Sequence, residues 1–262
     1  MAEQAPVAAA VLAGGAATDK VAEAGSAPCK PLVEVEGKPL VAWVAGALMA
    51  ASRVGPIVIV EGPTAPISAC GAPLAVPIVP AAGPSFIDTM TAAAHAHPDA
   101  DRLLLATGDL AMLTPEAVDG FVASCQDPAA EVSYPLVHLE EFDRAFPGRA
   151  KSPVRLREGR FIGANLVMVS RRFILEEGPV IARTFAERKS KVGMAMIFGF
   201  GFVLRLALGL LSVADLERRA SEMLGTVARA VPAPWPEIAF DTDDAEDLEL
   251  VRAYMRRRVE GA

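Results

Sequence analysis

The stretch VLAGGAATDKVAEAGSAPCKPLVEVEGKPLVAWV, residues 11–44, decides the fold. An apolar run ends in Gly14 and Gly15, a polar loop follows, and Lys30 comes where the chain returns to a second apolar run. Glycines directly after a strand let backbone N–H groups approach a phosphate, because no Cβ stands in the way. A lysine at the mouth of such a loop can neutralise phosphate charge. An ordinary tight turn and a solvated surface lysine would explain the same residues, so both interpretations stay open at this point.

Strand and helix patterns alternate through the first half of the chain. Short apolar runs predict strands at residues 7–13, 56–62, 74–80 and 101–110, and longer runs predict helices at 40–51, 84–97 and 114–125. Continuous apolar strands separated by helices indicate an α/β fold with a mostly parallel sheet that is covered on both faces. Ligands of such sheets bind beyond the carboxyl ends of the strands. We therefore expect the functional site at that edge.

The second half departs from this alternation. Residues 130–137 and 152–170, with a turn at Glu158 and Gly159, predict a small antiparallel extension of the sheet. The last third is mostly helical up to a final strand, which ends in an acidic cluster that caps the last helix. The sequence contains no internal repeat. It therefore predicts one domain over residues 1–262, with a helical insertion at about 186–224.

Composition and charge exclude several classes of protein. The 262 residues are 52% hydrophobic, which allows a large core, and the net charge of −7 disfavours nucleic acid as a partner. Three cysteines without paired spacing argue against a disulfide scaffold or a structural zinc site and suit a reducing compartment. The first residues lack the basic region of a signal peptide and predict a strand instead. We expect a cytoplasmic protein.

The most apolar segment lies at residues 192–211, and with the basic residues that precede it the region covers 188–211. Its charge-free part is shorter than the roughly 20 residues that a membrane-spanning helix needs, and Arg205 interrupts it, so no transmembrane segment is predicted. The basic sequence ERKSK leads into it. One or two buried helices, an exposed patch that contacts a membrane surface, and a homodimer contact all remain open for this segment.

Two acidic motifs stand where a metal could be held. Asp109 lies in the polar turn TGDL that ends the predicted strand at residues 101–110, and Asp241 and Asp243 belong to DTDDAEDL. A carboxylate at the end of a strand either caps a turn or binds a divalent metal, and aspartates also cap helices. His95 and His97 cannot share a helix face and are predicted to be surface residues.

Taken together, these pieces resemble the MobA-like branch of the nucleotidyltransferase superfamily, which has a three-layer, Rossmann-like GT-A fold. The family opens with L-A-G-G-x-G-T-R and, after a gap, P-K-x-L-x-x-V-x-G-K-P-L. This chain carries LAGG at residues 12–15, Thr18, KPL at 30–32, Val35 and GKPL at 37–40. The segments GPSFIDTMTAAAHAH, TGDLAMLTPEAV, FIGANLVMVS and DTDDAEDL resemble the later motifs of the family in the same order.

The resemblance implies a Mg²⁺-dependent transfer of an NMP from an NTP to a phosphorylated small-molecule acceptor, with release of pyrophosphate. It implies catalytic roles for Lys30, Asp109 and Asp243, and metal binding by Asp109, Asp243 and Asp241. Gly163 and Asn165 would lie on the acceptor side. The nucleotide-binding residues that it implies are Leu12, Ala13, Gly14, Gly15, Lys20, Gly83, Ser85 and Gly108.

The chain departs from the opening signature at two positions. Ala17 stands where the family has glycine, and Asp19 stands where it has an arginine that helps to hold the triphosphate. Lys20 is therefore expected to replace that arginine. Two alternatives follow: a nucleotide-binding module that has lost catalysis, and a GT-A glycosyltransferase that uses a nucleotide-sugar. The usual D-x-D of the glycosyltransferases lies mid-chain, whereas this one lies near the C-terminus.

Overall fold

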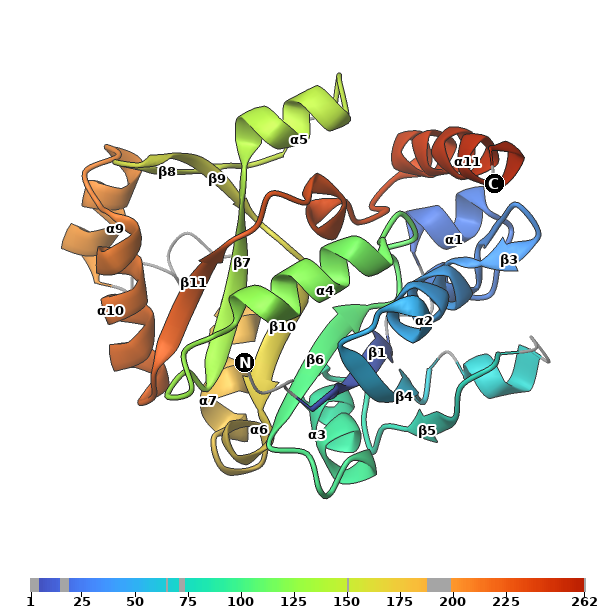
Figure 1. The fold of residues 1–262 in the computed structure, drawn as a ribbon, viewed down its shortest axis with the longest axis horizontal. Coiled ribbons are helices and arrows are strands. Elements are labelled where there is room, and N and C mark those ends of the chain that lie inside the picture. Colours follow the sequence, from blue (N-terminus) through green and yellow to red (C-terminus); the bar gives the residue numbers. More distant parts are fainter. Residues whose placement is uncertain are drawn as a thin grey trace.

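The computed structural model describes residues 5–14, 19–64, 66–70, 74–149, 151–187 and 199–261, and Figure 1 shows their arrangement. A nine-stranded mixed sheet runs through this part of the chain, with helices on both of its faces. Its strands are β1 (Val7–Ala13), β4 (Val54–Glu61), β5 (Ile78–Pro80), β6 (Arg102–Thr107), β7 (Val132–His138), β8 (Val154–Leu156), β9 (Gly159–Gly163), β10 (Leu166–Ser170) and β11 (Ala228–Pro232). A separate ribbon pairs β2 (Glu34–Val35) with β3 (Lys38–Pro39).

The strand order is β5-β4-β1-β6-β10-β7-β9-β8, with β11 beside β7. Strands β5, β4, β1 and β6 are parallel neighbours, and β10 runs antiparallel between β6 and β7. The hairpin β8–β9 continues from β7. Because β8 is antiparallel to β9, and β9 to β7, only β9 and β10 run against the common direction. The prediction of a mostly parallel α/β sheet with an antiparallel extension is confirmed.

Strand β1 lies in the middle of the parallel half and is buried on both faces. Val11 belongs to one hydrophobic core, whereas Ala10 and Leu12 belong to the core on the opposite face of the sheet. A strand that is dry on both faces needs apolar side chains at every position, which explains the unbroken run VAAAVLA.

Helices cover the two faces in separate layers. The core on one face includes residues of α2 (Leu40–Ala50), α4 (Pro115–Ser124), α5 (Leu139–Ala145) and α11 (Ala245–Glu260). The core on the other face includes residues of α3 (Phe86–Ala96), α6 (Arg171–Glu176) and α7 (Gly178–Glu187). The remaining elements are α1 (Lys20–Ala24), α9 (Phe200–Ala207), α10 (Val213–Leu224) and the short 3₁₀ turns η1 (Lys30–Leu32), η2 (Ile67–Cys70) and η3 (Pro236–Ala239).

Local start signals account for several helix boundaries. The Thr114 hydroxyl accepts from Ala117 N at 3.1 Å, and Pro115 occupies the first helical position of α4. The Asp244 carboxylate caps α11 by accepting from Asp247 N at 2.8 Å. Both helices therefore begin where the sequence places a capping side chain.

Three expectations were wrong in detail. The loop after β1 is partly helical, because Asp19 caps α1 and Val21 is buried in the core. The strand expected at residues 74–80 shrinks to β5, since prolines in this segment cannot donate to a sheet ladder. His97, expected on the surface, is 7% exposed, and its Nε2 lies 3.1 Å from the Ala9 carbonyl oxygen.

The apolar segment at residues 192–211 was expected to form buried helices or an exposed patch. Residues 192–198 lie outside the described residues, and α9, which follows them, has no buried residue. Within the described part, Phe200, Leu204, Leu208 and Leu210 are exposed, whereas Phe202 and Leu206 pack against a small core and Leu211 is buried. None of the helices in the described ranges is long and apolar enough to cross a membrane.

Candidate active site

Three segments far apart in the sequence bring one lysine and three carboxylates together. Lys30 begins η1, Asp109 follows β6, and Asp241 and Asp243 lie between η3 and α11. Lys30 Nζ lies 2.6 Å from Asp109 Oδ2 and 3.2 Å from Asp243 Oδ1. Carboxylate oxygens of Asp109, Asp241 and Asp243 all lie within 4.8 Å of one another. The predicted catalytic and metal-binding residues are thus neighbours at the carboxyl end of the parallel strands.

Hydroxyl and backbone hydrogen bonds hold these carboxylates in position. Thr107 donates to Asp109 Oδ1 at 2.5 Å. Thr242, which is fully buried, donates through its hydroxyl to the Asp109 carbonyl oxygen at 3.1 Å and so ties the two acidic loops together. Asp243 N donates to the buried carboxylate of Asp247 at 2.9 Å. Hydrogen bonds within the segment after β6 and the segment before α11, and between them, therefore hold the acidic cluster in addition to its ion pairs.

The charges of the cluster are only partly balanced. Burial would lower the pKa of Lys30, but the Asp109 and Asp243 carboxylates outweigh it and hold that pKa above its ordinary value. Burial raises the pKa of Asp243, and the nearby Asp241 charge raises it further, against the attraction of Lys30. Among the described residues, the three carboxylates are paired with only two ammonium groups, those of Lys30 and Lys151, so the cluster could accommodate another cation.

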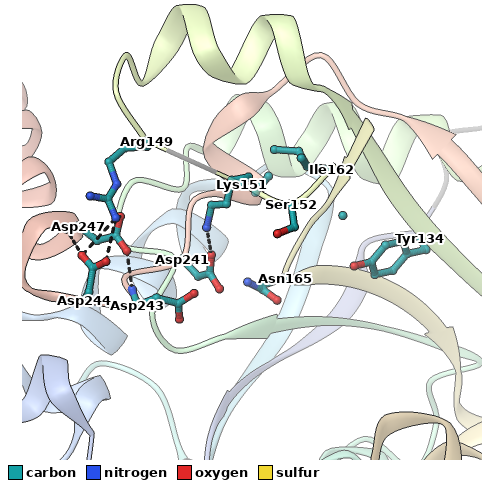
Figure 2. A pocket seen from close by; sticks show the side chains of 12 residues that line it. Tyr134, Arg149, Lys151, Ser152, Ile162, Asn165, Asp241, Asp243, Asp244 and Asp247 are labelled. Atoms are coloured by element: carbon teal, nitrogen blue, oxygen red, sulfur yellow. Dashed lines mark hydrogen bonds and ion pairs between the residues drawn. The ribbon is translucent and has the colours of Figure 1, made fainter. Parts of the chain in front are cut away.

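A cavity of 450 Å³ adjoins the cluster, and Figure 2 shows its side chains. Asp241 and Asp243 line it on one side, and Gly163 and Asn165, the residues predicted to face the acceptor, line it on another. The full lining is Tyr134, Arg149, Lys151, Ser152, Ile162, Gly163, Asn165, Ala239, Asp241, Asp243, Asp244 and Asp247. The predicted acceptor-side residues and two of the predicted metal ligands therefore share one cavity.

Two basic residues of this cavity were missed by sequence reasoning. Lys151 Nζ lies 2.5 Å from Asp241 Oδ1, and Arg149 contacts the carboxylates of Asp244, Glu246 and Asp247. Both lie in the loop after α5, in the sequence PGRAKSP. The available signal was charge complementarity between this basic loop and the acidic DTDDAEDL segment, but sequence alone does not say that the two meet.

Four of the predicted nucleotide-binding residues, Leu12, Ala13, Gly14 and Gly108, lie close together at the end of β1. Gly108 N donates to the Leu12 carbonyl oxygen at 3.0 Å. A Cβ on Gly108 would lie 3.4 Å from Ala13 Cβ, and a Cβ on Gly14 would lie 2.5 Å from Thr89 Cγ2. Gly14, which follows β1, is thus required because the backbone packs closely against α3. This structural reason does not depend on a bound phosphate.

The start of α3 uses its predicted binding residues for its own structure. The Ser85 hydroxyl accepts from Asp88 N, and the Asp88 carboxylate accepts from Ser85 N and hydroxyl, which completes a capping box. A Cβ on Gly83 would lie 2.5 Å from the same carboxylate. The contact of these residues with a base or ribose stays a prediction.

The departure from the family signature at Asp19 has a local reason. Asp19 Oδ1 accepts from Val21 N at 2.8 Å and so caps α1, whose first residue is the exposed Lys20. The prediction that Lys20 replaces the family's arginine is untested. Gly15, Ala17 and Thr18 lie outside the described residues.

The residues present fit a magnesium ion by their chemistry. Three carboxylates with converging oxygens form the hard oxygen-ligand set that Mg²⁺ prefers. Lys30 bridges Asp109 and Asp243, so it would share these two carboxylates with the ion.

Comparisons with known proteins show which family the chain resembles. The model of the MobA-like NTP transferase domain matches residues 9–170. A hypothetical transferase structure from Thermus thermophilus is 33% identical, with a TM-score of 0.78 over 94% of this chain and 100% of that chain. No curated protein matches the chain.

Two more distant structures share the fold. CMP:2-keto-3-deoxy-manno-octonic acid synthetase, solved in complex with CTP, gives a TM-score of 0.59 at 16% identity over 98% of this chain and 100% of that chain. A nucleotidyl transferase from Methanothermobacter thermautotrophicus gives 0.59 at 15% identity over 97% and 99%. At such identities the likeness is one of fold alone.

Proposed function

The chain belongs to the MobA-like NTP transferase family and is a nucleotidyltransferase, and from that premise we propose that it moves an NMP from an NTP to a phosphorylated small-molecule acceptor with release of pyrophosphate. The observation that carries the proposal is the cluster of Lys30, Asp109, Asp241 and Asp243 beside the 450 Å³ cavity. A cluster of cation-binding carboxylates next to a polar cavity suits a donor and an acceptor that both carry phosphate.

The proposed reaction forms one bond and breaks one. An acceptor oxygen attacks the α-phosphorus of the NTP, and the bond from that phosphorus to the bridging oxygen breaks as pyrophosphate leaves with the electron pair. Such transfers depend on positioning and charge neutralisation more than on covalent work by the protein. Lys30 suits the neutralising role, because its raised pKa keeps it protonated at all ordinary pH values.

Mg²⁺ is the proposed metal, held by Asp109, Asp241 and Asp243. When bound, it would supply positive charge against the phosphate oxygens of the donor. The protein's own contribution is to hold the carboxylates in place before a metal binds. Thr107 and Lys30 hold Asp109, Lys30 also contacts Asp243, and Lys151 holds Asp241.

The cavity offers a candidate group for the acceptor's phosphate. Arg149 contacts three carboxylates, whereas the ion pair of Lys151 has one partner, Asp241, which is itself a candidate metal ligand. If Asp241 bound a metal, its negative charge would be shared between the metal and Lys151. The Lys151 ammonium would then be available to bind an anion. Lys151 is therefore proposed to bind the phosphate of the acceptor.

The first experiment is a thermal-shift panel of the four NTPs with and without Mg²⁺. A ligand at 100 times its dissociation constant adds about 2.7 kcal/mol to the free energy of unfolding, which is a readily measured rise in Tm. We expect one NTP to give a shift that requires Mg²⁺. Absence of a shift with every NTP would contradict the proposed donor class.

The second experiment measures pyrophosphate release with the NTP that binds, across a panel of sugar phosphates and other phosphorylated metabolites. Release that depends on an acceptor supports the proposed transfer. Binding of an NTP without release under any of these conditions would favour a module that has lost catalysis. Consumption of a nucleotide-sugar instead of an NTP would favour a glycosyltransferase.

A further inference from the structure

Helix α9 carries apolar side chains on two faces, and only one face is packed against the protein. Phe202 and Leu206 lie against the hairpin β8–β9, in a small core with Phe161 and Leu211. The second face continues beyond the helix to residue 210. It consists of Phe200, Leu204, Leu208 and Leu210, which are 76%, 49%, 60% and 47% exposed. We call these four side chains the α9 patch.

The α9 patch is unusual for this molecule. It holds four of the eight large hydrophobic side chains that are exposed across the described ranges. Phe200, Leu204 and Leu208 follow one another at intervals of four residues, which puts them on the same side of the helix. An apolar cluster of this kind on a helix face usually marks an interaction surface, whereas single exposed hydrophobic residues need no explanation.

Three exposed arginines lie close to the α9 patch. The Arg155 side chain is so close to Gly209, between Leu208 and Leu210, that a Cβ on that glycine would lie 2.9 Å from Arg155 Cγ. Arg157 N donates to the Leu211 carbonyl oxygen at 2.9 Å. Arg205 is on α9 itself. All three are exposed.

The local charge is positive although the whole chain carries a net charge of −7. Across the part of the chain that the structure describes, no ion pair joins Arg155, Arg157 or Arg205 to a carboxylate. The neighbouring acid, Glu158, accepts from Val213 N at the start of α10. The α9 patch is therefore bordered by guanidinium groups that have no ion-pair partner among the described residues.

We propose that the α9 patch docks the protein on the surface of an anionic lipid bilayer. Phe and Leu side chains suit the boundary between headgroups and acyl chains, and the arginines suit anionic headgroups. Arginine also keeps its charge in water while its stem lies along apolar surface. Helix α9 has 8 residues and lies on the bilayer rather than across it, since spanning needs about 20.

A second copy of the chain is the less suitable occupant. In a two-fold symmetric dimer the same patch from both subunits would meet, and this would bring the arginine groups of the two copies together. Like charges that face each other across an interface are unfavourable. Anionic lipid removes this conflict, because it supplies the opposite charge.

The packing of the hairpin connects this surface to the candidate active site. Phe161 of β9 faces α9, whereas its neighbour Ile162 lines the cavity. Consecutive residues of a strand point to opposite faces, so the docked helix and the cavity lie on the two sides of β9. The membrane-bound face would therefore be close to the acceptor side of the enzyme.

The test is flotation of the full-length protein with vesicles of phosphatidylcholine, with and without phosphatidylglycerol. We expect binding that requires phosphatidylglycerol and weakens with added salt. The variant R155Q/R157Q/R205Q should bind the vesicles at least tenfold more weakly, since each basic residue near an anionic surface raises the membrane affinity roughly fivefold. The variant F200S/L204S/L208S should also lose binding.

The control is M49S on α2, which replaces another exposed hydrophobic side chain and should leave vesicle binding unchanged. The Tm of each variant establishes that it is folded. No binding of the wild-type protein to anionic vesicles would overturn the proposal, as would an equal loss in M49S. A wild-type dimer that becomes monomeric in F200S/L204S/L208S would assign the patch to a second copy instead.

Discussion

Replacement of Asp109 by Asn probes the acidic cluster most directly. The change removes one of three carboxylates whose oxygens lie within 4.8 Å of one another and keeps the size of the side chain. Two opposite unit charges about 4 Å apart attract each other by about 4 kcal/mol at an effective dielectric constant of 20. The attraction between one carboxylate and a divalent ion is therefore at least of this size. The net loss is smaller than this, because Lys30, 2.6 Å from Asp109, already neutralises part of the charge that the substitution removes.

We expect a net loss of at least about 2 kcal/mol in divalent-metal binding, or roughly 30-fold in the dissociation constant. Mn²⁺ is a suitable probe, because carboxylate sites that bind Mg²⁺ also bind Mn²⁺, whose free fraction is measurable by electron paramagnetic resonance. Isothermal titration with Mg²⁺ provides a second measurement. NTP binding that depends on Mg²⁺ should weaken in parallel.

Asp109→Asn should remain folded. Lys30 keeps Asp243 as a partner, so its ammonium is not left alone in a buried site. The free energy of unfolding should therefore fall by about 1–2 kcal/mol, below the 3–5 kcal/mol that is typical when a buried ion pair loses one member completely. Chemical denaturation measures this difference.

Asp119→Asn is the matched control. Its carboxylate accepts hydrogen bonds from Ser52 N, Ser52 Oγ and Arg53 N, between α4 and the turn before β4, and it does not line the cavity. This variant should lose stability without losing affinity for Mn²⁺. The reasoning is refuted if Asp109→Asn binds Mn²⁺ within threefold of the wild type, or if both variants lose metal affinity equally.

Three further changes test other parts of the structure. Lys151→Gln removes a cation that competes with the metal for Asp241, so the dissociation constant for Mn²⁺ should fall by about fivefold or more in titrations. Weaker binding of Mn²⁺ would contradict the ion-pair argument. Gly14→Ala should lower the free energy of unfolding by about 1–3 kcal/mol through its clash with Thr89 Cγ2, and Thr89→Ser should restore part of the loss in denaturation experiments. Burial lowers the pKa of His97, so the unfolded chain takes up a proton more readily and stability should fall as the pH drops below about 6.5. His97→Gln should flatten this dependence in thermal melts, and an unchanged slope would assign it to other groups.

Several features could be predicted from the sequence because they depend on neighbours along the chain. The apolar run of β1 predicts a strand buried on both faces, and its observed bounds agree with the prediction. Thr114 and Pro115 predict the start of α4 through a hydrogen bond that spans three residues. The order of the motifs predicted the family, and a family model confirms it.

The partners of the charged side chains depended on tertiary structure. Lys30 and Asp243 are 213 positions apart, and Lys151 and Asp241 are 90 apart. No local pattern states that these residues meet, because their contact requires that η1, the loop after α5 and the segment before α11 converge at one edge of the sheet. Sequence reasoning could propose Asp109 and Asp243 as ligands through a family motif, but it missed Lys151.

The same distinction holds for helices whose pattern is apolar. Sequence composition determined that residues 192–211 would be apolar and that their charge-free part would be too short to span a bilayer, but not which side chains would be buried. The hairpin β8–β9 covers Phe202 and Leu206 and leaves Phe200, Leu204 and Leu208 in contact with solvent. Hydrophobicity is a property of the residue, whereas burial depends on which distant surface packs against it.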